Sequence, residues 1–315
     1  MSRTAALLAA ILSLTAAPVL GAYPDRPVKL IVPWAAGGDT DVIYRAFAPH
    51  LQKHLGGQTV VIANIGGASG TKGAKEAKDS PADGYTLFAV HDSLHSTYYT
   101  GVADVRWEDF EPICLVSATP SIVTASPKTP WADMKAMIAD AKARPGQVSV
   151  GASLGSTSHF FPALVEKAAG VKFKYVPYDG TAPRMNALLG GHIDMGESNL
   201  TQKGKVDAGE LKFLAIATDK RVPELPNVPT LKELGINVTY AVNRGLLALK
   251  GTPPEAKAKL DAACAAAAKE PAFAEAMGKQ GTVVHYLGPK QYTEFLKEND
   301  KLNQTLARDL GMLKR

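Results

Sequence analysis

The segment LIVPWAAGGDTD, which runs from Leu30 to Asp41, decides how this chain folds and where we expect its site. It begins in an apolar run, residues 28–33, that is typical of a strand buried on both faces. Gly37 and Gly38 then permit a tight turn and a close approach of the backbone to a ligand, and Asp39 is a candidate helix N-cap. A strand, a glycine turn and a helix start predict free N–H groups and a positive dipole end at the strand edge, which is an anion site.

The same alternation of strand and helix continues along most of the chain. Further helices are predicted over residues 41–55, 131–143, 158–168 and 183–189, and further strands over 59–63, 85–90, 148–152, 173–177 and 213–218. Repeated strand-helix-strand units indicate an α/β fold with mostly parallel sheets.

Two long extended runs, residues 113–124 and 238–252, interrupt this pattern. They bracket a middle block, so we expect the chain to leave a first lobe, build a second, and return. The predicted lobes are residues 23–121 with 243–315, and residues 122–242. Ligands of open α/β sheets bind beyond the carboxyl ends of the strands, so the cleft between the lobes is the expected site.

The turn design recurs in the middle block. The segments GASLGSTSH (151–159) and YVPYDGTAP (175–183) each lead from a strand through small residues into a helix. A further segment, HDSLHSTYY (91–99), is predicted to be a loop rich in side-chain donors. Helix N-termini that face each other across the cleft would hold a carboxylate from both sides.

Backbone donors suffice for such binding. A micromolar Kd needs roughly 8 kcal/mol, and a hydrogen bond to a charged group contributes about 1.5 to 3 kcal/mol. Four or five of these bonds reach that value without a dedicated arginine. Asp39 and Asp41 would repel an anion unless they cap the helix or meet a cation.

The first 22 residues have the features of a cleaved secretory signal. Arg3 supplies the positive end, residues 5–15 are apolar, and the small residues Gly21 and Ala22 follow. We therefore expect export to the periplasm. The net charge of +5 is scattered over 315 residues without a basic block, which argues against nucleic-acid binding.

The two cysteines, Cys114 and Cys264, do not define a pairing. Export permits a disulfide, but buried cysteine is commonly a small hydrophobe, and we expect two unpaired thiols.

Two other classes of function fit short motifs. Ser153 lies in a G-x-S-x-G pattern, the nucleophile elbow of serine hydrolases, and Asp194 and His285 follow in the order of an acid and a base. The pair His50 and His54, and likewise His91 and His95, has a spacing that suits zinc on a helix. We favour neither: the first pair suits a helix C-terminus, and the second lies in a predicted loop.

In combination, several segments resemble the Bug family of periplasmic solute receptors, also called the tripartite tricarboxylate transporter receptor family. The matching segments are YPDRPVKLIVPWAAGG (23–38), GYTLF (84–88), GSTSHF (155–160), VPYDG (176–180), LLGGHID (188–194), KRVPELPNVPTLKELG (220–235) and GTPPEAKAKL (251–260). The resemblance implies a two-lobed Venus flytrap without enzymatic activity, cofactor or metal. It also implies a small carboxylate ligand and, as a partner, the membrane subunits of a tripartite tricarboxylate transporter.

Three positions depart from that family pattern, namely Asp39, Pro49 within the first helix, and Arg244 at the second crossing. They leave open whether the ligand is a di- or tricarboxylate, an amino acid or an aromatic acid. We expect a monomer. The predicted ligand-binding residues are Trp34, Ala36, Gly37, Gly38, Asp39, Asp41, His91, Ser93, Ser153, Ser156, Thr157, Ser158, Tyr178, Gly180 and Thr181.

Overall fold

The structure is a computed structural model that describes residues 23–315. The signal sequence predicted over residues 1–22 lies outside the described residues. Within residues 23–315, no helix has both the length and the apolar character needed to cross a membrane.

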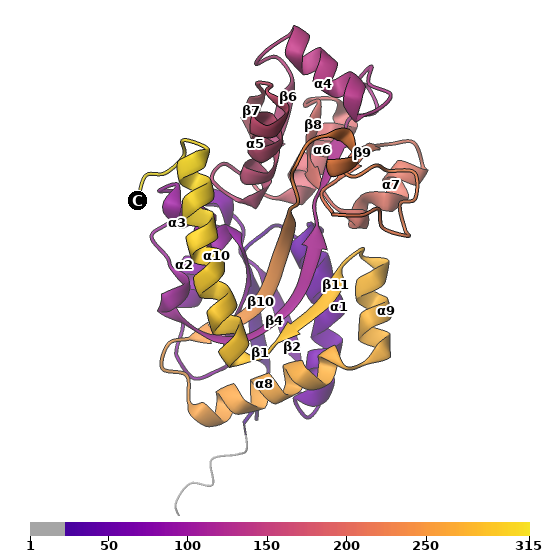
Figure 1. Cartoon of the computed structure of the whole chain (residues 1–315). Coiled ribbons are helices and arrows are strands. Elements are labelled where there is room, and N and C mark those ends of the chain that lie inside the picture. Colours follow the sequence, from indigo (N-terminus) through magenta and orange to yellow (C-terminus); the bar gives the residue numbers. More distant parts are fainter. Residues whose placement is uncertain (1–22) are drawn as a thin grey trace, which may run out of the picture.

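The first lobe is built on a six-stranded sheet with the strand order β11-β4-β10-β3-β1-β2. Its strands are β1 (Val28–Val32), β2 (Val60–Asn64), β3 (Thr86–His91), β4 (Phe110–Pro120), β10 (Ala241–Leu249) and β11 (Val283–Leu287). Its helices are α1 (Asp39–His54), α2 (Thr71–Lys78), α3 (Ser93–Tyr99), α8 (Pro254–Ala268), α9 (Pro271–Lys279) and α10 (Pro289–Asp309). Figure 1 shows α10 running along one side of this lobe until its C-terminal end reaches the other lobe.

The second lobe is built on a five-stranded sheet with the order β7-β6-β8-β5-β9. Its strands are β5 (Ile122–Ala125), β6 (Ser149–Ala152), β7 (Lys174–Pro177), β8 (Met195–Ser198) and β9 (Lys212–Ile216). Its helices are α4 (Met134–Ala143), α5 (Thr157–Ala169), α6 (Thr181–Gly190) and α7 (Lys203–Asp207), with a short 3-10 turn, η3 (Leu200–Gln202), before α7.

The two-lobed α/β architecture is confirmed, but the sheets are mixed rather than mostly parallel. In the first lobe β1 pairs in parallel with β2 and β3, whereas β10 pairs antiparallel with β3 and β4. In the second lobe β6 is parallel to β7 and β8, and β5 is antiparallel to β8 and β9. The antiparallel pairs arise where the chain crosses between the lobes, because β4 leads out of the first lobe and β10 leads back into it in the opposite direction.

The crossings meet at one place. Strand β4 passes into β5 at Ser121, whose N–H donates to the Tyr240 carbonyl at 3.1 Å, just before β10 begins. Ser121 also accepts a hydrogen bond at its carbonyl from Ala217 N at 2.9 Å. The outgoing and returning segments are therefore tied to each other between the lobes.

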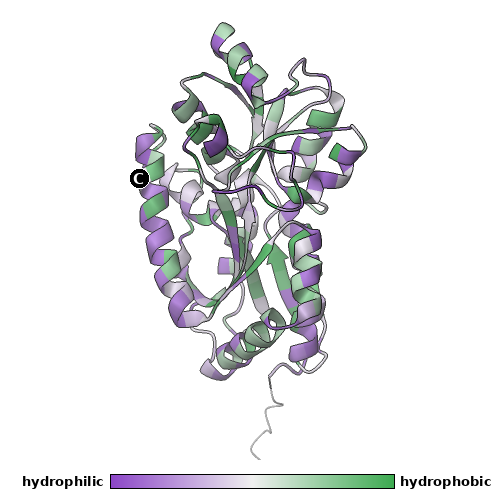
Figure 2. Ribbon diagram, turned by 45° about the vertical axis from the view of Figure 1, so that its right-hand side comes forward, coloured by the Kyte–Doolittle hydropathy of each residue, from purple (hydrophilic) through white to green (hydrophobic). Residues whose placement is uncertain are grey.

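Each lobe has its own apolar core. Phe47, Leu51 and Leu246 belong to a core on one face of the first sheet, and Met137, Phe161 and Leu214 belong to the core of the second lobe. Figure 2 shows the hydrophobic residues concentrated on the strands and the hydrophilic ones on the outer faces of the helices. Burial of these apolar faces explains why the predicted strands and helices form where the pattern places them.

The prediction of two unpaired thiols is wrong: Cys114 and Cys264 form a disulfide across a Cα–Cα distance of 6.6 Å. Cys114 lies on β4 and Cys264 on α8, 150 residues apart in sequence. Only the packing of α8 on β4 brings them together, which no local pattern reveals.

Pro49 does not end the first helix, because α1 continues through it to His54. His50 and His54 both contact the Glu270 carboxylate, at 2.7 and 2.5 Å, and Lys53 lies 2.9 Å from it. The spacing of four residues thus places His50 and His54 on one face of α1, where both bind Glu270 at the start of α9.

Candidate functional site

A small cavity lies between the lobes. Its walls come from the ends of β1, β3, β6, β8 and β10 and from the starts of α1, α5 and α6. The lining residues are Trp34, Gly38, Asp39, Thr40, His91, Ser153, Ser156, Thr157, Ser158, Gly180, Thr181, Arg184, Glu197, Val242 and Arg244.

Three helices begin at this cavity. Helix α1 of the first lobe starts at Asp39, and α5 and α6 of the second lobe start at Thr157 and Thr181. The starts of α1 and α6 lie close together, because a Cβ atom placed on Gly38 would lie 3.7 Å from Ala182 N. None of these three helices has a side-chain hydrogen bond at its N-cap, and among residues 23–315 the first two N–H groups of each helix have no hydrogen-bond partner. The cavity therefore receives the N-terminal ends of helices from both lobes, whose dipoles point their positive ends into it.

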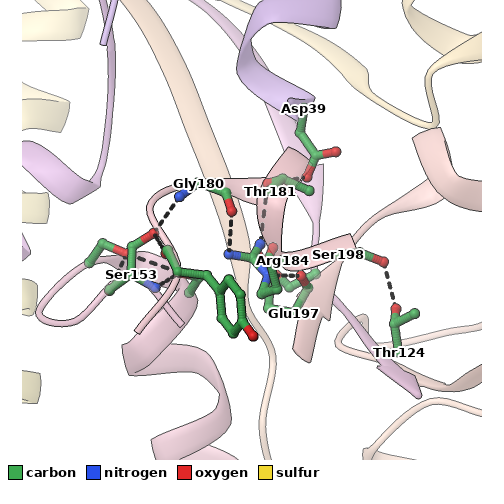
Figure 3. Close-up of polar contacts among 12 residues, drawn as sticks. Asp39, Thr124, Ser153, Gly180, Thr181, Arg184, Glu197 and Ser198 are labelled. Carbon is green, nitrogen blue, oxygen red and sulfur yellow. Dashed lines mark hydrogen bonds and ion pairs between the residues drawn. The ribbon is translucent and has the colours of Figure 1, made fainter. Parts of the chain in front are cut away.

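Asp39 bridges the lobes. Its carboxylate accepts hydrogen bonds from Thr181 Oγ1 at 3.1 Å and from Thr201 Oγ1 at 2.7 Å, both in the second lobe. Figure 3 shows Asp39 pointing at Thr181 from across the cleft. Asp39 is 3% exposed, so these bonds are shielded from water. The described conformation is closed, and Asp39 is part of what holds it.

Contacts beside the cavity also join the lobes. Ser69 N donates to Asp179 Oδ1 at 2.8 Å, and Ser69 Oγ donates to the Leu154 carbonyl at 2.9 Å. Thr100 Oγ1 donates to the Gly155 carbonyl at 3.4 Å. The loops that carry the two helix starts of the second lobe thus rest directly on the first lobe.

A buried ion pair forms one wall. Arg184 Nη2 lies 2.9 Å from Glu197 Oε2, and the two residues are 1% and 5% exposed. Arg184 also donates to the carbonyl groups of Glu197 and Gly180 and to Thr181 Oγ1, so each of its three nitrogens has a hydrogen-bond partner (Figure 3). Burial raises the pKa of Glu197 to about 7, with Asp39 adding to the rise and Arg184 opposing it.

Trp34 and His91 form an aromatic wall. Their rings stack with centroids 5.1 Å apart. His91 Nδ1 accepts the Ser93 N–H at 3.2 Å, which places the proton of the neutral ring on Nε2. Burial, helped by the nearby Arg244 guanidinium, lowers the pKa of His91 well below its usual value, so the wall is uncharged.

Asp41 is a structural residue rather than part of the cavity wall. Its carboxylate accepts hydrogen bonds from Gly37 N at 2.8 Å, from Arg45 Nε at 2.9 Å and from Asn64 Nδ2 at 2.9 Å. The Gly37 N–H, predicted as a ligand donor, is therefore occupied. Gly38 N likewise donates to the Ala35 carbonyl at 3.3 Å.

Ten of the predicted residues line the cavity, namely Trp34, Gly38, Asp39, His91, Ser153, Ser156, Thr157, Ser158, Gly180 and Thr181. Five do not, namely Ala36, Gly37, Asp41, Ser93 and Tyr178. Ser93 lines a smaller cavity beside the first. Tyr178 supplies its carbonyl to Ser153 Oγ at 2.7 Å, and its side chain packs in an apolar cluster.

The cavity also contains Thr40, Arg184, Glu197 and Val242, which are not among the predicted ligand-binding residues, and Arg244, which the sequence marks as a departure from the family without giving it a role. The glycines of β6 and β8 are a sequence feature that could have indicated a large buried side chain at the position of Arg184. Gly151 and Gly196 are register partners on β6 and β8, and a Cβ atom on Gly196 would lie 2.9 Å from Arg184 Cδ. Paired glycines in adjacent strands make room for this buried side chain.

The segment 91–99 is not the predicted loop. Residues Ser93–Tyr99 form helix α3, and His95 on this helix contacts Asp300 Oδ1 at 2.9 Å. The segment combines hydroxyl, aromatic and histidine side chains, which made it look like a loop, yet six of the seven α3 residues are buried.

The residues of the hydrolase hypothesis do not form a triad. Ser153 Oγ donates to the Tyr178 carbonyl and accepts from Gly180 N at 2.9 Å. Within residues 23–315 it has no hydrogen bond to a histidine. Asp194 is bound to Ser149, and His285 lies on β11 of the other lobe against Phe295. Ser153 therefore shapes the turn between β6 and α5.

Comparison with known proteins gives the family. Residues 43–312 match the model of the tripartite tricarboxylate transporter family receptor. The protein BugT of Bordetella pertussis is 33% identical over 304 residues, covering 94% of this chain and 93% of that protein.

Two solved structures agree over almost the whole chain. The periplasmic binding protein BugD superimposes with a TM-score of 0.88 at 32% identity, covering 93% of this chain and 100% of that one. Rpa4515 of R. palustris, solved with adipate, superimposes with a TM-score of 0.87 at 30% identity, covering 92% and 98%. The chain belongs to the Bug family, the tripartite tricarboxylate transporter receptors, and is a solute-binding protein of that family.

Proposed function

We propose that this receptor binds a small carboxylate in the cavity between its lobes and closes around it. The observation that carries the proposal is the meeting of three uncapped helix starts, from both lobes, at one cavity. A ligand that contacts both halves stabilises the closed state over the open one. Adipate bound to Rpa4515, a relative at 30% identity, supports a carboxylate ligand.

The proposed cellular role follows from the family. The signal predicted over residues 1–22 would direct the chain to the periplasm. There the receptor would deliver its ligand to the membrane subunits of a tripartite tricarboxylate transporter, or report the ligand to a sensor. We further propose that the lobes, residues 23–121 with 243–315 and residues 122–242, move as units about the crossings at Ser121 and Tyr240.

A thermal-shift screen followed by calorimetry tests the ligand class. The panel is succinate, malate, adipate, citrate, aspartate, glutamate and benzoate, with glucose and putrescine as a neutral and a cationic control. We expect at least one acid to bind with a Kd of roughly micromolar order, which corresponds to about 8 kcal/mol. Binding of no acid, or of putrescine alone, would contradict the proposal.

Binding is expected to weaken as the pH rises. The Glu197 carboxylate on β8 is surrounded by Arg184 of α6, Asp39 of α1, Arg244 of β10 and Ser121 of the crossing. Its pKa is raised to about 7, so it takes up a proton near neutral pH. A bound ligand carboxylate repels the ionised form of Glu197 and so favours its protonated form. The affinity for the ligand is therefore highest below pH 7 and decreases as Glu197 ionises above pH 7. We expect roughly a tenfold loss between pH 6 and pH 8, since one pKa unit is about 1.4 kcal/mol.

The Glu197→Gln variant keeps the hydrogen-bonding shape and removes the titration. Its affinity, measured by calorimetry, should stay level over the same pH range. Glu233→Gln, at an exposed ion pair with Arg221, is the matched control and should follow the wild-type curve. A pH profile that Glu197→Gln leaves unchanged would show that another group is responsible.

A further inference from the structure

Arg244 is a buried cation at the cavity. It lies on β10 directly opposite His91 of β3, and it is 3% exposed. Its side chain is fixed by neutral oxygens: Nε donates to Thr40 Oγ1 at 3.2 Å, and Nη1 donates to Thr119 Oγ1 at 2.8 Å and to the Val242 carbonyl at 3.4 Å. The guanidinium is thus held in one orientation at the cavity wall.

This guanidinium has no counter-ion in the described part of the chain. Among residues 23–315 no carboxylate oxygen lies within 4.0 Å of its nitrogens, and its Nη2 forms no hydrogen bond. Arginine stays protonated in proteins, and a buried charge without a partner is strongly unfavourable. Burial also lowers the pKa of Arg244, and the more distant Asp39, Glu197 and Asp92 carboxylates offset only part of this decrease. A ligand that brings a negative charge would remove it.

Neither buried carboxylate at the cavity supplies that charge directly. Glu197 is paired with Arg184, whose Nε and Nη1 also donate hydrogen bonds. Asp39 is bonded to Thr181 and Thr201 of the opposite lobe. Of the two arginines at the cavity, Arg184 is therefore neutralised within the wall, whereas the Nη2 group of Arg244 has no hydrogen-bond partner among residues 23–315.

We propose that Arg244 forms the ion pair with a carboxylate of the ligand and so makes the receptor select an acid over its neutral analogue. This inference rests on the proposed function and adds a charged side chain to the uncapped helix starts. An ion-paired hydrogen bond in a water-poor cavity is stronger than one to a neutral donor. The planar guanidinium also fixes the direction from which a carboxylate approaches.

The test compares an acid with its primary amide. The probes are the acid of the panel above that binds wild type most tightly and the same molecule with one carboxylate converted to a carboxamide, prepared for each carboxylate in turn. Calorimetry should give wild-type binding at least roughly 30-fold tighter for the acid than for one of these amides, as expected for a hydrogen bond between charged groups. Arg244→Gln should weaken binding of the acid by about that factor and change binding of that amide less than about threefold.

Variants separate a binding role from a structural one. Arg308→Gln, on the exposed face of α10, is the matched control and should bind as wild type does. Arg244→Lys keeps the charge without the planar fork and should retain part of the preference for the acid, which keeps the inference testable if Arg244→Gln does not fold. Equal losses for acid and amide, or an unchanged preference in both Arg244 variants, would overturn the role of Arg244. Failure of wild type to bind any acid of the panel would instead overturn the proposed function.

Discussion

Gly38→Leu should abolish ligand binding while the protein stays folded. Gly38 has an extended backbone, with φ −79° and ψ 165°, which any residue adopts without strain. A Cβ atom there would lie 3.3 Å from the Ala35 carbonyl oxygen, which must move by a few tenths of an ångström, and 3.7 Å from Ala182 N. The rest of a leucine side chain would enter the space between the starts of α1 and α6. The lobes could not close on a ligand, and we expect a loss of at least roughly 100-fold in affinity, or about 2.7 kcal/mol.

Calorimetry with the acid found in the screen measures this loss, and circular dichroism reports the fold. Gly278→Leu makes the same change in α9, where a Cβ atom would have no neighbour within 4 Å, and it should leave affinity unaffected. If Gly38→Leu binds as tightly as wild type, the starts of α1 and α6 do not need to approach each other for binding.

Asp39→Ala should shift the ligand-free receptor toward an open state. The substitution removes two hydrogen bonds from the Asp39 carboxylate to Thr181 and Thr201, both buried and both between the lobes. Each hydrogen bond to a charged group contributes about 1.5 to 3 kcal/mol, so the closed fraction should fall by at least roughly tenfold relative to the open fraction.

Small-angle X-ray scattering of the ligand-free protein tests this shift. The radius of gyration of Asp39→Ala should exceed that of wild type and return toward it when the acid is added. Asp207→Ala, at an exposed ion pair with Lys203 on α7, removes the same charge and should leave the curve unchanged. Identical scattering from wild type and Asp39→Ala would mean that Asp39 does not hold the lobes together.

The sequence pattern predicted the secondary structure well, because apolar runs and glycine turns are local. It did not predict strand direction, since an apolar run such as residues 113–124 is the same in a parallel and an antiparallel pair. The segment 91–99 differs from its predicted structure for a related reason. Its polar side chains are buried against α10, through contacts such as those of His95 and Tyr99 with Asp300.

The parts of the candidate site that are formed by the backbone could be predicted from the sequence. The turns before α1, α5 and α6 could be located from glycine, serine and threonine alone. The ion pair of Arg184 with Glu197 could not, because its partners are 13 residues apart on α6 and β8 and meet only in the folded lobe. Asp39 and Asp41 look alike in sequence, yet one bridges the lobes and the other holds the turn at Gly37.

A crystal structure of the receptor with the tightest-binding acid is the decisive test of the proposed binding mode. We expect the acid in the cavity between the lobes, with its carboxylate oxygens accepting hydrogen bonds from first-turn N–H groups of α1 and of α5 or α6, and with one carboxylate against Arg244. An acid that contacts only one lobe would contradict this binding mode. So would an acid that binds elsewhere while Asp39 keeps its hydrogen bonds to Thr181 and Thr201 and the cavity holds no ligand.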